Sequence, residues 1–290
     1  MVKVEVVKPG FLTTIQDFGR PGEAATGMPW GGVMDRHSYA LAHQILGNNP
    51  LDAVLEITML GPSLRFLGNV NAVITGAEMS AQLNGKQIQN NKVYALQFGD
   101  ELSFGKLKNG FRAYLAFDQQ IDVSVVLGSK ATYLPAKMGG FLGRALQRGD
   151  VFNLKDSVRF SQKEIQSTHL RPLELVTPLI LRVSQGPEFY KLTSSQKETL
   201  FNTIYTLKND SNRMGIRLDG TPIHGVEAGI ISSGVVRGTV QLPPSGCPII
   251  LAADAPVTGG YLRVLNCMEH SMNQLAQVPI GDRVVFSLEN

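Results

Sequence analysis

The residues best suited to chemistry lie close together, between residues 14 and 48. Gln16, Asp17, Arg20 and Asp35 provide an amide, two carboxylates and a guanidinium within this stretch. The same stretch contains four glycines, which are Gly19, Gly22, Gly31 and Gly32. Glycine permits backbone conformations that other residues resist, and polar groups on such turns are well placed to bind a ligand. The stretch therefore predicts a binding loop for a polar ligand. The alternative is a polar hairpin loop in which Asp35 caps the next helix.

Two arginines, Arg213 and Arg217, form a second candidate group. They flank a glycine, and the planar guanidinium can bind two oxygens of a carboxylate or phosphate at once. This pattern favours the binding of an anionic ligand. An equally good interpretation is an ion pair between these arginines and a nearby acid, Asp210 or Asp219.

A third group surrounds Asp254. This acid precedes a run whose backbone N–H groups could accept an anion, formed by Thr258, Gly259, Gly260 and Tyr261. Gln241 precedes two prolines at the end of a predicted strand, where its amide would be a fixed hydrogen-bond donor. The alternative for residues 258–261 is an ordinary Gly-Gly turn.

The sequence lacks the motifs of several enzyme classes. It contains no Gly-Lys-Ser or Gly-Lys-Thr of a P-loop, no Gly-x-Ser-x-Gly nucleophile elbow and no Cys/His pairs at zinc spacing. The five histidines are scattered, and we assign no residue as a metal ligand. Lys137 lies in an Ala-Lys-Met run like that of biotin attachment sites, but the surrounding pattern is missing, so we interpret it as a solvated lysine. The sequence thus argues against a self-sufficient metal hydrolase or serine hydrolase.

Composition narrows the class of protein further. The chain has 290 residues, 43% hydrophobic and 18% charged, which suits one large or two ordinary globular domains. A net charge of +3 without a Lys/Arg stripe gives no reason to expect nucleic acid as a partner. The opening residues alternate like a strand, and no apolar run approaches the ~20 residues of a membrane span. With only two cysteines, Cys247 and Cys267, we expect a cytoplasmic protein that does not associate with membranes.

The elements that position these groups are predicted to be mostly strands. Alternating apolar residues beside Asn84–Gly85, Asn109–Gly110 and Asp219–Gly220 predict three β-hairpins. Helices are fewer. One is predicted after Asp35, ending at Gly47.

The second half of the chain predicts two more helices and a second lobe. Ser195 and Glu198 have the spacing of a capping box, and residues 269–277 have one apolar side. A Gly-Asp turn that opens a strand occurs at residues 99–104 and again at residues 281–286. These patterns predict an N-terminal lobe over residues 1–155, a polar connector over 156–178 and a C-terminal lobe over 179–290.

Motifs along nearly the whole chain, in the expected order, resemble one family. They lie at residues 10–22, 32–36, 47–48, 55–58, 61–62, 75–77, 128–129, 211–215, 240–244, 253–254 and 258–261. Together they resemble the allophanate-hydrolase-subunit-2 type proteins, also called the biotin-dependent carboxyltransferase family. That family includes the C subunit of 5-oxoprolinase and an antagonist of a sporulation-kinase inhibitor. The chain departs from the family pattern at Gly31–Gly32 and at residues 255–257, which leaves the substrate open.

The resemblance implies a fold and an activity. The expected fold is mainly β with a few helices, in two lobes that are each a cyclophilin-like β-barrel. The expected activity is that of one component of a 5-oxoprolinase, which uses ATP and Mg²⁺ to open the lactam of 5-oxoproline to L-glutamate. The implied partners are a subunit-B protein of the allophanate-hydrolase-subunit-1 type and a LamB/YcsF-type subunit, in a hetero-oligomer.

The resemblance also implies roles for the candidate residues. The predicted catalytic residues are Asp17, Asp254 and Arg213. The predicted substrate- or phosphate-binding residues are Gln16, Arg20, Asp35, Arg217, Gln241, Thr258, Gly259, Gly260 and Tyr261. In this interpretation the arginines neutralise phosphate or carboxylate, the acids orient water or Mg²⁺, and the Gly259–Gly260 backbone holds an oxyanion.

Two other functions stay open within the same resemblance. One is carboxyl transfer from carboxybiotin to urea or a related amide, with biotin supplied by a partner. The other is a regulatory role in which this chain only binds a subunit-B-like kinase inhibitor. Turnover of 5-oxoproline coupled to ATP hydrolysis would distinguish the 5-oxoprolinase prediction from carboxyl transfer and from the regulatory role.

Overall fold

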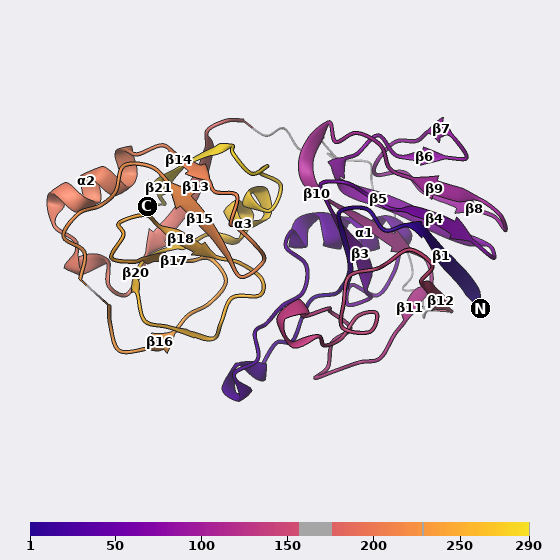
Figure 1. The fold of residues 1–290 in the computed structure, drawn as a ribbon, viewed down its shortest axis with the longest axis horizontal. Coiled ribbons are helices and arrows are strands. Elements are labelled where there is room, and N and C mark those ends of the chain that lie inside the picture. The colour runs from indigo at the N-terminus through magenta and orange to yellow at the C-terminus, as the bar shows by residue number, and fades with distance from the viewer. Residues whose placement is uncertain (157–175, 228, 290) are drawn as a thin grey trace. The chain divides into compact units, whose positions relative to one another are not determined.

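The computed structural model describes residues 1–156, 176–227 and 229–289, and within these residues the fold is mainly β with three α-helices (Figure 1). The chain divides into two compact units. The first comprises Met1–Arg20 and the described residues from Gly31 to 156, and the second comprises Pro21–Trp30 and the described residues from 176 onward. Most of the predicted connector, residues 157–175, lies outside the described residues, so the predicted lobe boundary stays a prediction. No helix of the described part is long and apolar enough to cross a membrane.

The first unit contains two sheets and one α-helix. A seven-stranded sheet has the order β11-β12-β1-β4-β9-β6-β7 and a five-stranded sheet has the order β2-β3-β10-β5-β8. The bounds of the first six of these elements are β1 Val2–Lys8, β2 Leu12–Gln16, α1 Arg36–Leu46, β3 Val54–Thr58, β4 Ser63–Phe66 and β5 Val70–Glu78. The others are β6 Gln82–Leu83, β7 Lys86–Gln87, β8 Tyr94–Leu96, β9 Glu101–Ser103, β10 Asn109–Phe117, β11 Gln120–Asp122 and β12 Val151–Lys155.

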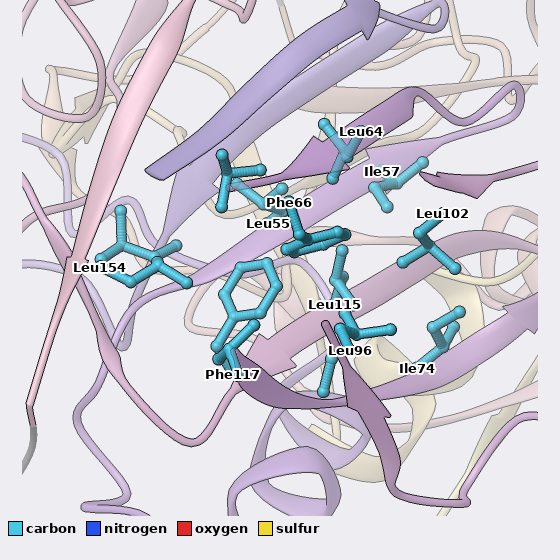
Figure 2. Packing of buried hydrophobic residues seen from close by; sticks show 14 of the residues in the cluster. Leu55, Ile57, Leu64, Phe66, Ile74, Leu96, Leu102, Leu115, Phe117 and Leu154 are labelled. Carbon is cyan, nitrogen blue, oxygen red and sulfur yellow. The ribbon is translucent and has the colours of Figure 1, made fainter. Parts of the chain in front are cut away.

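Side-chain alternation gives the five-stranded sheet two different faces. Leu115 and Phe117 of β10 point into a core shared with Leu64 and Phe66 of the other sheet (Figure 2). The alternate residues Tyr114 and Ala116 face α1, where a smaller apolar cluster forms. The α1 side also carries buried polar residues. One row of them crosses four paired strands and consists of Thr14, Glu56, Tyr114 and Thr75.

The second unit is built on a closed barrel. Its strand order is β13-β20-β17-β18-β15-β14-β21, and β13 closes it by pairing in parallel with β21. The strands are β13 Leu179–Gln185, β14 Tyr205–Leu207, β15 Gly215–Asp219, β17 Thr239–Leu242, β18 Ile249–Leu251, β20 Leu262–Cys267 and β21 Arg283–Leu288. The barrel is accompanied by α2 Ser194–Asn202, α3 Glu269–Leu275 and a ribbon of β16 Ser233–Gly234 with β19 Thr258–Gly259.

Several local predictions are confirmed. Asp35 is the N-cap of α1 and accepts a hydrogen bond from the Ser38 backbone N–H, while Gly47 ends the helix with φ of 67°. The Asn84–Gly85 turn joins β6 and β7 as an antiparallel hairpin. In each case the signal is local, because the residues that form the cap or turn adjoin the element that they end.

Two predicted hairpins are wrong. Asn109–Gly110 lies at the start of β10, and the preceding strand β9 pairs with β4 and β6 instead of β10. The residues act as an irregularity, since the pairing of β10 with β5 shifts register between Asn109 and Ala113. Asp219–Gly220 does not join two paired strands either, because β15 pairs with the earlier β14 and the later β18.

The capping box of α2 lies two residues before the predicted one. Thr193 is the N-cap, and it exchanges hydrogen bonds with Gln196 in place of the predicted Ser195 and Glu198. Both pairs have the same spacing, so the sequence alone did not select between them.

Candidate functional site

Asp17 follows directly after β2 and is buried. Its Oδ1 accepts hydrogen bonds from the Gly19 N–H at 2.8 Å and from the Ser129 hydroxyl at 2.6 Å. Its Oδ2 accepts from the Lys130 N–H at 2.6 Å. Asp17 therefore ties the end of β2 to a loop more than a hundred residues later. Hydrogen bonds to an ionised acceptor are the stronger kind, so this connection is firm.

Arg20 binds the same loop from the other side. The residue is 2% exposed, and its guanidinium donates from Nε to the Val126 carbonyl and from Nη2 to the Ala131 carbonyl, at 3.1 and 2.7 Å. The turn at Gly139 packs here as well, because an added Cβ at Gly139 would lie 2.7 Å from Nη2. Asp17 and Arg20 together hold residues 126–131, which we name the clamped loop.

Gln16 lies at the end of β2 and has no exposed surface. Its Nε2 donates to the Thr14 hydroxyl at 3.0 Å and to the Thr132 carbonyl at 3.1 Å. Its Oε1 is also buried and has no hydrogen-bond partner among the described residues. Buried polar atoms are nearly always paired, so an unpaired acceptor beside a glycine-rich loop marks a position of interest.

Lys130 of the clamped loop is half-buried, and its ammonium donates to the Ile121 carbonyl at 2.9 Å. Burial lowers the pKa of Lys130, and the positive charge of Lys155 lowers it further. Nearby acids, among them Asp52 and Asp122, act in the opposite direction. The loop that Asp17 and Arg20 hold thus carries a lysine that loses its proton more easily than an exposed one.

Asp35 acts at the start of α1. Its carboxylate accepts from the Ser38 backbone N–H at 3.0 Å and from the Ser38 hydroxyl at 2.6 Å. Its own N–H donates to the Tyr114 hydroxyl at 2.8 Å. This geometry is that of a helix cap. A further role of Asp35 in substrate binding stays a prediction.

Two residues that the sequence interpretation did not assign to a site, Glu56 and Tyr114, complete this part of the first unit. The Tyr114 hydroxyl donates to Glu56 Oε2 at 2.9 Å, and the same oxygen accepts from the Met34 N–H at 2.7 Å. Burial raises the pKa of Tyr114 well above its usual range, and the negative charge of Glu56 adds to this, so the phenol stays protonated. A charged residue inside the apolar run Leu55–Ile57 was the available signal.

In the second unit, Arg213 and Asp254 form a buried bidentate ion pair. Arg213 donates from Nε to Asp254 Oδ2 at 2.8 Å and from Nη2 to Oδ1 at 2.9 Å. The Asp254 N–H also donates to the Arg213 carbonyl at 2.8 Å. The structure therefore brings together two predicted site residues that lie 41 positions apart in the sequence. The pair joins the end of β18 to the turn before β15.

Gln241 lies in β17, opposite Ile249 on one side and Arg263 on the other. Its side chain is buried, and its Nε2 has no hydrogen-bond partner among the described residues. Gly259 of the β16–β19 ribbon packs on this amide so closely that a Cβ at position 259 would overlap it. The structure thus brings Gln241 and Gly259 together. Arg263 is held by Glu188 in a second bidentate pair and donates to the Gly234 carbonyl of the ribbon.

The remaining predicted residues are more exposed. Arg217 is half-exposed and lies 3.5 Å from Asp210, so one of the ion pairs considered from the sequence is present. Tyr261 is 40% exposed, and Thr258 lies in β19 paired with Gly234. The Gly260 carbonyl accepts from the Ile230 N–H at 2.8 Å, which places residues 229–236 along residues 257–260.

The acids do not fit the Mg²⁺ that the resemblance implies. Three protein donors already approach the Asp17 carboxylate, and a guanidinium occupies both oxygens of Asp254. Within residues 1–156, 176–227 and 229–289, no group of three or more His, Cys, Asp or Glu side chains is placed to hold a metal. Mg²⁺ prefers a set of oxygen ligands at near-octahedral geometry. We therefore derive no step through a metal ion at these residues.

Comparison with known proteins gives one family. The family model described as "Carboxyltransferase domain, subdomain A and B" matches residues 26–288. The C subunit of Escherichia coli 5-oxoprolinase is 32% identical over 284 residues, which cover 98% of this chain and 90% of that protein. Its Haemophilus influenzae counterpart, also named as the C subunit of 5-oxoprolinase, is 31% identical over 285 residues with the same coverage. Saccharomyces cerevisiae urea amidolyase is 32% identical over 307 residues, but these are only 16% of that protein.

Solved structures agree with the fold. The Kluyveromyces lactis urea amidolyase superposes with a TM-score of 0.90 at 31% identity, covering 99% of this chain and 19% of the other. The K. lactis urea carboxylase gives a TM-score of 0.89 at 30% identity and covers 27% of that chain. This chain therefore spans between 16% and 27% of these larger relatives.

Proposed function

This chain belongs to the family of carboxyltransferase domains with subdomains A and B, and on that premise we propose that it is a subunit of an ATP-dependent 5-oxoprolinase. The resemblance drawn from its motifs is confirmed. One observation carries the proposal: the match to the C subunit of E. coli 5-oxoprolinase covers 98% of this chain and 90% of that protein. The match to S. cerevisiae urea amidolyase, by contrast, covers 16% of that protein.

The proposed reaction opens the lactam of 5-oxoproline to L-glutamate. An amide carbonyl resists water, so the reaction needs the carbonyl oxygen to be activated and the attacking water to be oriented. ATP would supply the activation by phosphorylating that oxygen. Water would then add to the carbon, and the ring C–N bond would break as the nitrogen takes up a proton, which leaves an acyl phosphate. A second water would hydrolyse the acyl phosphate to glutamate and phosphate. We assign the ATP-dependent step to the whole complex and to no residue of this chain.

The residues of this chain are proposed to hold the substrate and the loops around it. Asp17 and Arg20 are positioning residues in this proposal, because their hydrogen bonds go to the clamped loop. The Arg213–Asp254 pair fixes the start of the β15 region in the same way. In the first unit, the buried Gln16 is the group proposed to contact substrate. A binding role for Gln241 of the second unit stays a prediction. Direct catalytic roles for Asp17, Asp254 and Arg213 stay predictions.

We further propose that activity requires partner subunits. The relatives are named as one subunit of an enzyme or as a segment of a larger one. The proposed partners are a subunit-B protein of the allophanate-hydrolase-subunit-1 type and a LamB/YcsF-type subunit. Neither ATP nor Mg²⁺ is assigned a site on this chain.

The test is glutamate release from 5-oxoproline with ATP and Mg²⁺, using this chain with and without its two proposed partners. We expect release only from the complete mixture, with stoichiometric ADP. An assembled complex that hydrolyses no lactam would overturn the enzyme proposal and would favour a regulatory role in which the chain only binds its partner. A mixture that lacks only this chain is the control.

The second candidate is carboxyl transfer to urea or a related amide. The TM-score of 0.90 to K. lactis urea amidolyase is the observation that favours it. Biotin would have to arrive on a partner under this proposal, because Lys137 is an exposed residue in a tight turn with φ of 51° and lies outside any biotin-carrier pattern. Carboxylation of urea by the assembled complex with a carboxybiotin donor would support this second candidate against the first.

A further inference from the structure

The side-chain amide of Gln16 has one satisfied end and one unsatisfied end. Both hydrogens of Nε2 have acceptors, which are the Thr14 hydroxyl at 3.0 Å and the Thr132 carbonyl at 3.1 Å. Oε1 is buried and has no hydrogen-bond partner within the described part of the chain. The residue as a whole is 0% exposed. An unsatisfied buried acceptor destabilises a protein, so a ligand that pairs with it gains that energy on binding.

The orientation of this amide is determined by its partners. If nitrogen and oxygen were exchanged, the amide oxygen would face the Thr132 carbonyl oxygen, and two acceptors would be in contact. The Thr132 carbonyl can accept only from a donor, so Nε2 must lie on that side. The unsatisfied atom is therefore an acceptor, and its partner must be a donor.

The surroundings of Gln16 are held in place independently of this amide. The Thr132 hydroxyl donates to the Ile15 carbonyl and the Thr132 N–H donates to the same atom, both at 2.9 Å. The Gly139–Gly140 turn packs on Ala131 and Thr132 so closely that a Cβ on either glycine would overlap them. The Gly140 N–H donates to the Lys130 carbonyl at 2.9 Å. These contacts hold the Nε2 side of the amide in place, so the direction of Oε1 is fixed before a ligand binds.

We propose that Gln16 Oε1 accepts a hydrogen bond from the N–H of an amide-type substrate. The inference rests on the proposed function, in which that group is the lactam N–H of 5-oxoproline. Urea, the substrate of the second candidate function, presents the same N–H beside a carbonyl. Gln16 would therefore select substrates that carry this donor over analogues in which an ether-type oxygen replaces the N–H. Because Gln16 is fully buried, binding would also displace the residues that cover it.

The experiment measures binding to the assembled complex by isothermal titration calorimetry. The probes are 5-oxoproline, its lactone analogue 5-oxotetrahydrofuran-2-carboxylate, and urea. The lactone has the same ring and carboxylate, but an oxygen replaces the N–H and would face Oε1 as a second acceptor. For the unmodified chain we expect 5-oxoproline to bind about tenfold to a hundredfold more tightly than the lactone, since sites built around a hydrogen bond reject analogues that lack it.

Three variants separate the acceptor from its surroundings. Gln16→Met removes the acceptor at similar size, and we expect the preference for 5-oxoproline to fall to about twofold or less. Thr14→Val removes a partner of Nε2 but keeps Oε1, and it should retain most of the preference. Gln97→Met changes an exposed glutamine of the same unit and should behave like the unmodified chain.

The outcomes distinguish the inference from the proposed function. Equal discrimination by the unmodified chain and Gln16→Met would overturn the inference, as would no discrimination by the unmodified chain. The measurement on the unmodified chain tests the inference even if Gln16→Met fails to fold. Urea binding that depends on Gln16, without 5-oxoproline binding, would keep the acceptor role and overturn the 5-oxoprolinase proposal. Lactam hydrolysis that does not depend on Gln16 would support the 5-oxoprolinase proposal and overturn the acceptor role of Gln16. If neither 5-oxoproline nor urea binds, the inference is also overturned.

A second readout follows amide hydrogen exchange. The Gly140 and Thr132 N–H groups are bonded to carbonyls of the frame around Gln16. We expect 5-oxoproline to slow or speed their exchange severalfold in the unmodified chain and to leave them unchanged in Gln16→Met. A ligand-induced change of the same size in both proteins would count against the inference.

Discussion

At the scale of single residues, the two arginines singled out from the sequence behave differently although they lie four positions apart. Arg213 is buried and paired with Asp254 through two hydrogen bonds, at 2.8 and 2.9 Å. Arg217 is half-exposed, and its nearest acid oxygen is 3.5 Å away. Buried charges depend on their partner far more than exposed charges do. An arginine therefore stabilises the fold at position 213 and contributes little to stability at position 217.

Replacing Arg213 tests this contrast. We expect Arg213→Ala to lower the free energy of unfolding by about 3–5 kcal/mol, because it leaves the Asp254 carboxylate buried without its cation. Arg217→Ala should change it by less than about 1 kcal/mol. Urea denaturation followed by circular dichroism measures both. Equal effects of the two substitutions would contradict the assignment of Arg213–Asp254 as a buried pair.

The buried side chain of His43 makes the stability of the chain depend on pH. Burial lowers the pKa of His43 from 6.5 to about 4. Between these pH values the unfolded chain binds the proton and the folded chain does not. The contribution of His43 to the free energy of unfolding is therefore complete above pH 6.5 and is lost as the pH falls toward 4. The loss is at most about 1.4 kcal/mol per pH unit.

The measurement is the free energy of unfolding at several pH values for the unmodified chain and His43→Leu. We expect the slope between pH 4.5 and 6 to be smaller in the variant by up to about 1.4 kcal/mol per unit. Other acids titrate in this range in both proteins, so the difference between slopes is the relevant quantity. Identical slopes would show that His43 titrates normally.

At the scale of elements, the polar residues of the first unit act through the segments that they hold. Asp35 caps α1, Tyr114 and Glu56 hold the two N–H groups before it, and Asp17 holds the clamped loop. These hydrogen bonds join loops to the end of β2 and to internal positions of β3 and β10. Loops that carry functional groups are usually positioned by a rigid scaffold in this way.

The cap of α1 allows two roles of Asp35 to be separated. We expect Asp35→Ala to cost about 1–2 kcal/mol of stability, because the Ser38 N–H loses its acceptor. Asp35→Ser should retain most of the stability, since serine is also a good N-cap. If Asp35→Ser is stable but the complex loses lactam hydrolysis, Asp35 also contacts substrate, as predicted from the sequence. Unfolding and activity measurements on the same preparations decide this.

The clamped loop gives a local prediction. In Asp17→Ala the Lys130 N–H and the Ser129 hydroxyl lose their acceptor, so the loop should open more often. We expect hydrogen exchange at Lys130 and its neighbours to rise about tenfold or more, with strands elsewhere unchanged. Glu78→Ala, which removes an acid from a partly exposed pair with Lys108, is the matched control. Unchanged exchange in Asp17→Ala would contradict a positioning role.

At the scale of the whole molecule, the chain leaves its first unit once and returns. Residues Pro21–Trp30 group with the second unit, while the residues on either side group with the first. The start and end of this excursion are close together, because a Cβ on Gly32 would lie 2.7 Å from the Asp17 carbonyl oxygen. The excursion is therefore a loop closed at its base within the first unit, and part of the second unit comes from it.

This arrangement predicts the effect of removing the excursion. We expect replacement of residues 21–30 by a short glycine-serine linker to leave the first unit folded and to speed hydrogen exchange in the barrel strands of the second unit. The first unit keeps all its strands, whereas the second loses a segment that groups with it. Inserting the same linker at the exposed Asn84–Gly85 turn is the control. Equal exchange in both variants would contradict this assignment of the segment.

Sequence reasoning reached the fold class, the caps of α1 and the hairpin at Asn84–Gly85, since these follow from local patterns. It missed the true partners of β9 and β15, because strand pairing depends on which distant segments meet. For the site, it selected Gln16, Asp17, Arg213 and Asp254 among others. It did not find Glu56 or Tyr114, whose hydrogen bond to each other forms across the paired strands β3 and β10.

The linear chain was enough to establish a mainly β protein of a carboxyltransferase-domain family, because composition, periodicity and ordered motifs can be compared without coordinates. The folded chain was needed to pair Arg213 with Asp254 and to leave one buried oxygen of Gln16 without a partner. Hydrogen bonds between residues far apart in the chain depend on distances that the fold sets, and no spacing in the sequence encodes them.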